Sequence, residues 1–386
     1  MQTVKLKDVV MRVKDKIDKD NTHLEYYIGG EHIDSGELCI TKKGKLEGST
    51  IGPAFHMHFM PGDVLLMSRN PHLKKAGVVD FEGICSDVSY ICRTKDENIL
   101  SQRYLPFIFQ TDHFWKFVEE NKKGGLPFFL NWSDFEKYEF QLPSIDKQRE
   151  MADLLWAAQE TKLAYIELLK QTDELVKSQF IEMFGTPEDN HHEYPIGTIS
   201  DVVCDVHYGT SKKASENGKY TYIRMNNITY DGELDLIDTK RISVPENELE
   251  GCIVRKGDVL FNRTNSRELV GKTCVFTLNE PMIIAGYIIR LRMNGKARAE
   301  YISTFLNLKS SKLMLMAMAK GAVGQANINA KEVKSIRIVI PPHNIQQQFC
   351  QLVEQSDKSK FSVSNRNLSR CLVILKTTFL ILKLLT

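Results

Sequence analysis

The sequence has no surplus of charge of either sign and no hydrophobic run of membrane-spanning length. Its 386 residues carry a formal net charge of +2 at pH 7, so any surface that binds nucleic acid must come from local clusters of basic residues. The N-terminal segment has no apolar stretch of the signal-peptide type. The apolar segment 371–386 is interrupted by Lys376 and Lys383 and is too short to span a bilayer. We therefore interpret 371–386 as a buried helix and expect a cytoplasmic protein without a membrane partner.

The sequence also has no Cys-x-x-Cys pair among its eight cysteines. Without an export signal, we expect all of them to be free thiols in a reducing cytosol. They are Cys39, Cys85, Cys92, Cys204, Cys252, Cys274, Cys350 and Cys371. His56 and His58 fall on one face of an expected strand, as two zinc ligands would, but no further ligand cluster lies nearby. We interpret both histidines as ordinary strand residues and expect no metal site.

Motifs for catalysis are missing as well. The Pro-Pro pair at 341–342 lacks the preceding acid or amide and the following aromatic residue that an amino-methyltransferase loop needs. The segment VGKT at 270–273 resembles the end of a phosphate-binding loop, but Ser266 stands where its first glycine belongs. Asp63 and Asp258 have no paired acid at the spacing of a nuclease metal site, so we interpret them as turn residues. We expect no catalysis by this chain; a self-contained or degenerate DNA methyltransferase or nuclease is the alternative.

What the sequence does contain is a tandem repeat. Four pairs of segments match in the same order along the chain: LKDVV (6–10) with ISDVV (199–203), YYIGGEHIDSGEL (26–38) with TYIRMNNITYDGEL (221–234), PGDVLLMSRN (61–70) with KGDVLFNRTN (256–265), and NWSDFEKYEFQLP (131–143) with NINAKEVKSIRIVIP (327–341). One such match could be chance, but four in register are not. The chain is therefore interpreted as a duplication whose halves have diverged.

Each half has the same predicted plan. Short β-branched and aromatic runs come first, separated by Gly, Asn and Asp turns. A helical stretch follows, at 97–124 in the first half and at 299–321 in the second, and a last strand leads into a proline junction. We expect an α+β protein with two pseudo-repeated mixed α/β domains and two long helices packed as an antiparallel coiled coil. The expected boundaries are 1–143, 144–185, 186–342 and 343–386.

Both proline junctions lead into segments of helical period. Asp146 and Asn344 occupy equivalent places and are predicted N-caps, and Gly185 is the predicted end of the first helix. A rod of about 40 residues is roughly 60 Å long and cannot bury its apolar face on one small domain, so the second helix is its expected antiparallel partner. The alternative is that each helix packs on its own domain. The expected contact faces contain Leu155, Ile166, Leu169, Val176, Phe180, Phe349 and Leu352.

These motifs together carry a resemblance to a known family. The junctions LPSIDKQ and IPPHNIQQQ, the half-repeats GDVLLMSRN and GDVLFNRTN, and the segment VHYGTSKKASENGKYTYIRMNNI resemble the specificity subunits of Type I DNA restriction–modification systems. The resemblance covers almost the whole chain. It implies two target-recognition domains that each read half of a split DNA sequence, on helices that set the gap and dock two methyltransferase subunits. S-adenosylmethionine and ATP would then bind the methyltransferase and the separate nuclease-translocase subunits, and no cofactor would bind this chain.

Reading of double-stranded DNA needs Arg, Lys, Asn or Gln at base edges and small polar or basic groups at phosphates. Loops in the second half offer Tyr208, Gly209, Thr210, Ser211, Lys212, Lys213, Arg224, Asn226, Asn227, Arg263, Thr264, Asn265, Gln325 and Asn327. Loops in the first half offer His32, Ser68, Arg69, Asn70, Lys74 and Lys75. The halves differ at these positions, so the predicted target is asymmetric. The alternatives are that single residues are solvated turns, or that the chain is a protein-binding scaffold that does not meet DNA.

Overall fold

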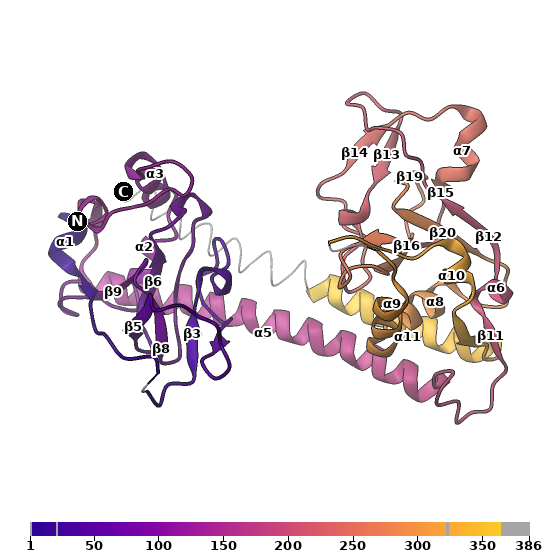
Figure 1. The fold of residues 1–386 in the computed structure, drawn as a ribbon, viewed down its shortest axis with the longest axis horizontal. Helices are drawn as coiled ribbons and strands as arrows, with labels where there is room; N and C mark the ends of the chain where they lie inside the picture. Colours follow the sequence, from indigo (N-terminus) through magenta and orange to yellow (C-terminus); the bar gives the residue numbers. More distant parts are fainter. Residues whose placement is uncertain (1, 21, 322–323, 364–386) are drawn as a thin grey trace. The chain divides into compact units, whose positions relative to one another are not determined.

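The computed structural model describes residues 2–20, 22–321 and 324–363. The chain divides into two compact units (Figure 1); the described part of the first ends at Tyr165, and the second begins at Ile166. The segment 371–386, interpreted as a buried helix, lies outside the described residues, as does Cys371. All cysteines within the described ranges are free thiols. Among the described helices, none combines the length and apolar character needed to cross a bilayer.

The first unit contains two four-stranded sheets. One has the order β2-β9-β6-β7 and the other β4-β3-β8-β5, in which β3 and β8 are parallel. The strands are β2 (Val10–Val13), β9 (Ser89–Thr94), β6 (Val64–Met67), β7 (Ala76–Val78), β4 (Gly44–Lys45), β3 (Tyr26–Ile28), β8 (Gly83–Ser86) and β5 (Phe55–Phe59). All four residues of β6 are buried, because this strand lies between β9 and β7 and contributes to two apolar clusters.

The second unit repeats this arrangement. Its sheets have the orders β12-β20-β16-β18 and β14-β13-β19-β15, and β13 and β19 are the parallel pair. The strands are β12 (Val203–Tyr208), β20 (Ile288–Met293), β16 (Val259–Asn262), β18 (Thr273–Val275), β14 (Lys240–Ile242), β13 (Tyr220–Ile223), β19 (Met282–Ile284) and β15 (Ile253–Val254). The predicted duplication is therefore confirmed strand by strand.

The pair of strands that closes each unit is repeated too. A two-stranded ladder closes each unit: β1 (Gln2–Lys5) with β10 (Glu139–Leu142), and β11 (Ile196–Thr198) with β22 (Arg337–Val339). The remaining short elements are α1 (Leu6–Val9), η1 (Gly30–His32), η2 (Pro71–Leu73) and α4 (Trp132–Phe135) in the first unit, and α6 (Ile199–Val202), η3 (Met225–Asn227), α7 (Glu246–Cys252), β17 (Thr264–Asn265), β21 (Ala326–Asn327) and α10 (Ala330–Lys334) in the second.

Each predicted helical stretch before the last strand is broken into two helices. The first unit has α2 (Leu105–Ile108) and α3 (Asp112–Asn121), and the second has α8 (Ala299–Asn307) and α9 (Lys309–Met318). Each stretch is helical as predicted, but it is divided because one residue in it is extended. Thr111 has ψ 146° and its hydroxyl accepts from the Phe114 N–H, which starts α3; Leu308 has ψ 149°.

The two proline junctions are fixed by equivalent buried glutamines. Gln148 donates to the carbonyls of Ile99 and Pro143, both at 2.9 Å, and accepts from the Ser101 N–H at 3.0 Å. Gln346 repeats all three bonds in the second unit, to the carbonyls of Lys296 and Pro341 and from the N–H of Arg298. Both glutamines are fully buried. Each therefore ties the first turn of a long helix to the domain that precedes it.

The hydrogen bonds of Gln148 and Gln346 also explain why the predicted N-caps are wrong. Helix α5 runs from Ile145 to Phe184 and α11 from His343 to Val363. Asp146 and Asn344 are thus the second residues of their helices. The end of α5 was predicted correctly: Gly185 has a φ of 67°, and its N–H donates to the Ile181 carbonyl.

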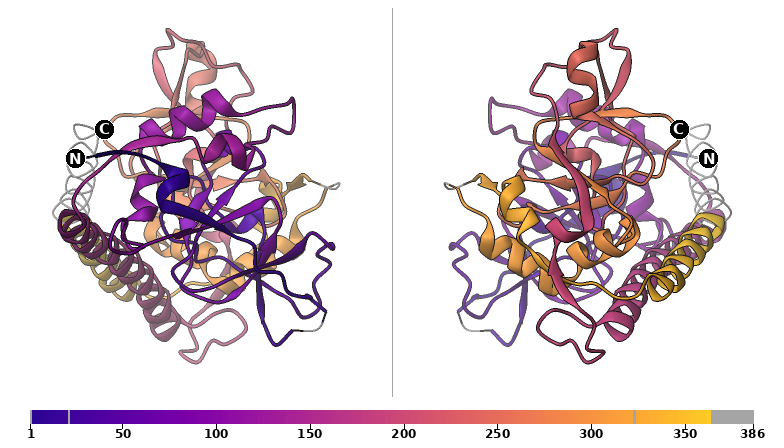
Figure 2. Two further views of the ribbon diagram at one scale, coloured as in Figure 1. Left: turned by 90° about the vertical axis from the view of Figure 1, so that its left-hand side faces the viewer. Right: turned by 90° about the vertical axis from the view of Figure 1, so that its right-hand side faces the viewer.

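Within the second unit, α11 packs on the second half of α5 (Figure 1, Figure 2). The Phe349 ring lies 5.4 Å from the rings of both Phe180 and Phe184, and Lys360 pairs with Asp173. Later residues of α11 meet earlier residues of α5, so the predicted antiparallel pairing is confirmed here. Phe180, Phe184 and Phe349 also belong to the core of the second domain, so packing on the domain, the alternative, occurs as well.

The other expected contact residues of the helices are distributed differently. Leu155 is fully buried in the core of the first unit, so it does not lie on an open contact face. Val176 packs against the core of the second unit, Leu169 and Leu352 are half-buried, and Ile166 is exposed. One face of α5 therefore belongs to the domains themselves.

Candidate nucleic-acid interface

Strands β6 and β16, which lead into the candidate loops, each begin directly after the same buried ion pair. Asp63 accepts from the Arg93 guanidinium at 2.7 and 2.8 Å, and Asp258 accepts from Arg292 at 2.8 and 3.0 Å. Each aspartate also accepts from a backbone N–H three residues earlier and is only 2% exposed. The hydrogen bonds to Asp63 raise the pKa of Arg93. The interpretation of both aspartates as turn residues is confirmed.

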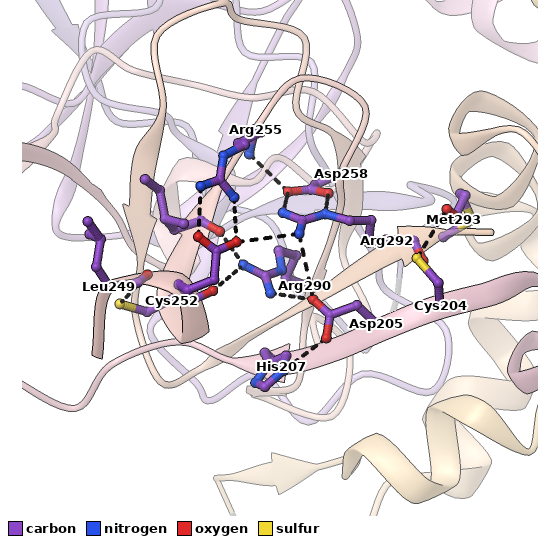
Figure 3. Close-up of polar contacts among 12 residues, drawn as sticks. Cys204, Asp205, His207, Leu249, Cys252, Arg255, Asp258, Arg290, Arg292 and Met293 are labelled. Carbon is purple, nitrogen blue, oxygen red and sulfur yellow. Dashed lines mark hydrogen bonds and ion pairs between the residues drawn. The ribbon is translucent and has the colours of Figure 1, made fainter. Parts of the chain in front are cut away.

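The second unit extends this pair into a network (Figure 3). Arg290, 1% exposed, pairs with Asp205 of β12 and donates to the Glu250 carbonyl of α7 at 2.9 Å. The hydrogen bonds from Arg255 hold the pKa of the Glu250 carboxyl at about 2. Strand register places Ile91, fully buried, at the position of Arg290 in the first unit. The network therefore belongs to the second unit, where it fixes the strand that carries His207 and Tyr208.

The first strand-end face is formed by residues 68–75 and the loop 121–129. Arg69 forms a bridge with Phe129, and its guanidinium carbon lies 5.5 Å from the ring centroid. The Asn70 side chain accepts from the Phe128 N–H at 3.2 Å. The Lys122 ammonium lies 4.5 Å from the centre of the Phe128 ring. The sequence prediction named Arg69 and Asn70 but missed both phenylalanines; their place after Lys122 and Lys123 is the signal that could have found them.

The second strand-end face is formed by Tyr208, residues 263–265 and residues 325–330. The Arg263 guanidinium carbon lies 4.8 Å from the centroid of the Tyr208 ring. The Tyr208 hydroxyl accepts from the Ala330 N–H at 2.8 Å. Thr264 pairs with Asn327 between β17 and β21, and Gln325 is exposed beside them. This face brings together residues from three distant parts of the second half.

Several predicted contact residues are used by the fold itself. His32 and Asn227 are equivalent and accept from the backbone N–H groups of Gly29 at 2.9 Å and Arg224 at 2.8 Å. Asn227 is 1% exposed and Thr264 is 5% exposed. Other members bond to nearby backbone or side-chain groups: Ser68 to Val88, Lys75 to Gly30, and Asn265 to Asn262. These residues shape the loops from within.

Two basic residues of the loop 208–213 and the neighbouring loop 224–227 have their positive charges balanced by carboxylates. Lys212 pairs with Glu248 at 2.7 Å, and Arg224 pairs with Asp238 at 2.9 Å; Asn226 also donates to Asp238. Thr210 bridges to Ala285. Tyr208, Ser211, Lys213 and Asn226 are exposed, as are Arg69 and Lys74 in the first half.

Gly209 shows why this loop follows its path. A Cβ atom at Gly209 would lie 2.2 Å from the Ile284 carbonyl oxygen and 2.3 Å from that of Ala285. The close approach of the two backbones therefore requires glycine at this position.

The chemistry that these two faces offer is recognition. Arginine, asparagine and glutamine side chains beside aromatic rings match base edges and phosphates. The described residues hold no group of three or more His, Cys, Asp or Glu side chains placed to bind a metal ion. His58, considered as a zinc ligand, instead contacts Asp15 at 2.7 Å and Glu82 at 2.8 Å.

Comparison with known proteins agrees with this picture. Residues 193–369 match the family described as the Type I restriction modification DNA specificity domain. The chain is 25% identical over 239 residues to the Type I restriction enzyme EcoKI specificity subunit of Escherichia coli strain K12, a match that covers 58% of this chain and 51% of that protein. The chain thus spans about half the length of this relative.

Two solved structures share the fold. The S subunit of a Type I restriction–modification system from M. genitalium is 13% identical with a TM-score of 0.56, and the alignment covers 99% of this chain and 95% of that one. A chain from a structure describing complex assembly and conformational transition of the type I R-M system is 18% identical with a TM-score of 0.53, and the alignment covers 100% and 97%. In its second half this chain is thus similar to the Type I restriction modification DNA specificity domain, and it is similar over 58% of its length to a Type I restriction enzyme specificity subunit.

Proposed function

We propose that this chain is the sequence-specific DNA-recognition subunit of a Type I restriction–modification complex. Each domain reads one half of an asymmetric bipartite site, and the long helices dock two methyltransferase subunits. The chain itself is not catalytic; S-adenosylmethionine binds the methyltransferase subunits, and ATP binds nuclease-translocase subunits that join indirectly. The cytoplasm, where the host DNA lies, is its place of action.

The observation that carries this proposal is the contrast between scaffold and face. The two domains have the same sheets, the same Asp–Arg pair and the same buried glutamine. Their strand-end faces instead carry different residues, with Arg69 and Phe129 in one and Arg263 and Tyr208 in the other. One scaffold that presents two unlike polar faces is suited to two unlike half-sites. Each well-matched base contact contributes about 1–3 kcal/mol of discrimination, so a few contacts per face give a specific site.

Methylome sequencing of a host that expresses the chain with its modification subunit tests this function. We expect one bipartite motif with unlike halves, methylated only when both subunits are present. A motif with identical halves would contradict the reading of two faces. Methyl transfer by the purified chain alone would support the enzymatic alternative, and DNA binding without sequence preference would support the scaffold alternative.

A further inference from the structure

Each strand-end face contains one arginine whose guanidinium lies over an aromatic ring. The distances are 5.5 Å for Arg69 over Phe129 and 4.8 Å for Arg263 over Tyr208. Both rings are partly exposed, Phe129 by 37% and Tyr208 by 43%. Arg69 is exposed and Arg263 is half-buried, and one side of each guanidinium is covered by its ring.

These two arginines also differ from their neighbours in charge compensation. Other arginines of the same sheets pair with carboxylates, as Arg93 does with Asp63 and Arg292 with Asp258. Within the described ranges, no carboxylate oxygen lies within 4.0 Å of Arg69 or Arg263. Their positive charges are consequently available to an outside partner that supplies acceptor atoms.

The two stacked pairs come from different positions of the repeat. Val64 of β6 pairs with Cys92, and Val259 of β16 pairs with Leu291, so β6 and β16 align residue by residue. This alignment puts Ser68 at the place of Arg263. Arg69 then corresponds to Thr264, which is 5% exposed.

The rings are not equivalent either. Phe129 forms a bridge with Lys123 just as Asn327 does with Lys320, so the second half has an amide where the first has a ring. Tyr208 comes from β12 instead. An interaction that the duplication had simply copied would use matching positions. The arginine–aromatic pair therefore arose independently in each half. This indicates that both pairs serve the same function at non-equivalent positions of the repeat.

We propose, on the basis of the DNA-reading function above, that Arg69 and Arg263 are the main base-reading side chains and that each reads a guanine edge. An arginine fork bonded to guanine O6 and N7 is the commonest specific contact in the major groove. Stacking uses the flat face of a guanidinium and leaves its edge for hydrogen bonds. In Arg263 the Nε group is buried and Nη1 donates to the Gly286 carbonyl at 3.5 Å, so the fork offered to a base consists of Nη2 and the second N–H of Nη1.

Tyr208 and Phe129 are positioning residues in this proposal. The backbone of Arg263 is already fixed, because its N–H donates to the Tyr287 carbonyl and its carbonyl accepts from the Ile328 N–H, both at 2.9 Å. The Tyr208 hydroxyl is held by Ala330. With both ends fixed, the ring restricts the guanidinium to few orientations, which lowers the entropy cost of binding a base. Since Arg69 and Arg263 stand one repeat position apart, the two guanines fall at different places within the two half-sites.

The test uses the complex with its methyltransferase subunits and a DNA library randomised over both half-sites. Arg263→Lys keeps the charge but loses the fork, and we expect it to reduce the preference for guanine at one position of one half-site by about 10-fold or more. Arg69→Lys should do the same at one position of the other half-site. Tyr208→Leu should weaken the same position as Arg263→Lys, and Tyr208→Phe, which restores the ring, should recover the preference.

The matched control is Arg267→Lys, in the same loop as Arg263. Among the described residues no aromatic ring stacks on Arg267, and its Nε donates to the Met316 carbonyl, so the substitution should leave base preference unchanged. Equal weakening of all sequences by Arg263→Lys would identify a phosphate contact and overturn the proposal. So would a loss of preference in Tyr208→Phe equal to that in Tyr208→Leu. A wild-type complex without any sequence preference would instead contradict the DNA-recognition function itself.

Discussion

The first and second domains of this chain share the hydrogen bonds of their helix junctions but differ in the side chains at their strand ends. Both contain a fully buried glutamine with three equivalent hydrogen bonds, Gln148 in one and Gln346 in the other. At the strand ends the chemistry diverges, so that Ser68 in the first domain stands where Arg263 stands in the second. Folding constrains the first set of residues, because a buried polar group without a partner is costly. The strand-end positions have no such shared hydrogen bonds, so under the proposed function they can differ with the half-site.

The comparison predicts that different residues control stability and sequence specificity. Substitutions of buried residues should destabilise one domain and leave the other intact, because each domain has its own core clusters. Substitutions at the faces should change which sequence is read with little effect on unfolding. The three tryptophans all lie in the first half of the sequence, so tryptophan fluorescence reports on the first domain alone.

The largest expected effect comes from removing a junction glutamine. Gln148→Leu leaves the Ser101 N–H and the carbonyls of Ile99 and Pro143 buried without their partner, which should cost about 3 kcal/mol at roughly 1 kcal/mol for each bond. Gln346→Leu should cost the second domain a similar amount. Peptide-resolved hydrogen exchange on the full chain measures both.

Gln171→Leu is the control for this comparison. Gln171 is exposed on α5 and bonds only to Glu167 of the same helix among the described contacts, so its loss should be close to neutral. If Gln148→Leu and Gln346→Leu loosened the same peptides, the two junctions would not be independent copies.

A smaller effect is expected from the buried ion pair. Arg93→Met leaves Asp63 buried without its cation and should destabilise the first domain by about 2 kcal/mol, because hydrogen bonds to charged groups contribute more than neutral ones. Tryptophan fluorescence during urea unfolding measures the change in the free energy of unfolding of the first domain. Arg292→Met should cost the second domain a comparable amount by hydrogen exchange, since Asp258 is equally buried.

Arg103→Met is the matched control for Arg93→Met. Arg103 and Asp153 form a surface pair with side chains 61% and 65% exposed, and such pairs contribute about 0–1 kcal/mol. A cost for Arg103→Met as large as that for Arg93→Met would show that burial is not what makes the Asp63–Arg93 pair important.

The sequence was sufficient for features that depend on pattern. Four repeated segments predicted the duplication, helical period predicted the long α5, and Gly185 predicted its end. All of these depend on local residue order or on the comparison of the chain with itself. The sequence could not reveal that Asp146 lies inside the helix, because the start is set by Gln148 bonds to residues about 50 positions away.

The candidate faces were predictable only in part, because they too depend on contacts between segments that are distant in the sequence. Tyr208 and Arg263 each stood out as polar loop residues, but their stacking joins segments that the sequence separates. Asn227 also matched the composition of a reading loop, yet it is buried as the acceptor of a local turn. Composition identifies loops that are able to touch DNA, whereas the tertiary hydrogen bonds decide which of their side chains are available.

The smallest expected effect is a pH dependence of the first domain that comes from His58. Burial acts to lower the pKa of His58, but the hydrogen bonds to Asp15 and Glu82 outweigh it and raise the pKa above its usual value. The protonated imidazole is therefore favoured in the folded state. The contribution of His58 to the free energy of unfolding is complete below the unfolded pKa of about 6.5. It is lost as the pH rises through the higher pKa of the folded state. The corresponding residue of the second domain is Ile253, which is buried and does not titrate.

Tryptophan-monitored urea unfolding between pH 6 and pH 9 tests this difference. The first domain should lose up to about 1 kcal/mol over this range, the size of a partly exposed ion pair. His58→Gln should remove that part of the slope. His56→Gln is the control, because His56 contacts only the Pro53 carbonyl among the described hydrogen bonds and its replacement should leave the slope unchanged. A slope that survived His58→Gln, or one that disappeared with His56→Gln, would show that the Asp15–His58–Glu82 contact is not what distinguishes the two domains in their response to pH.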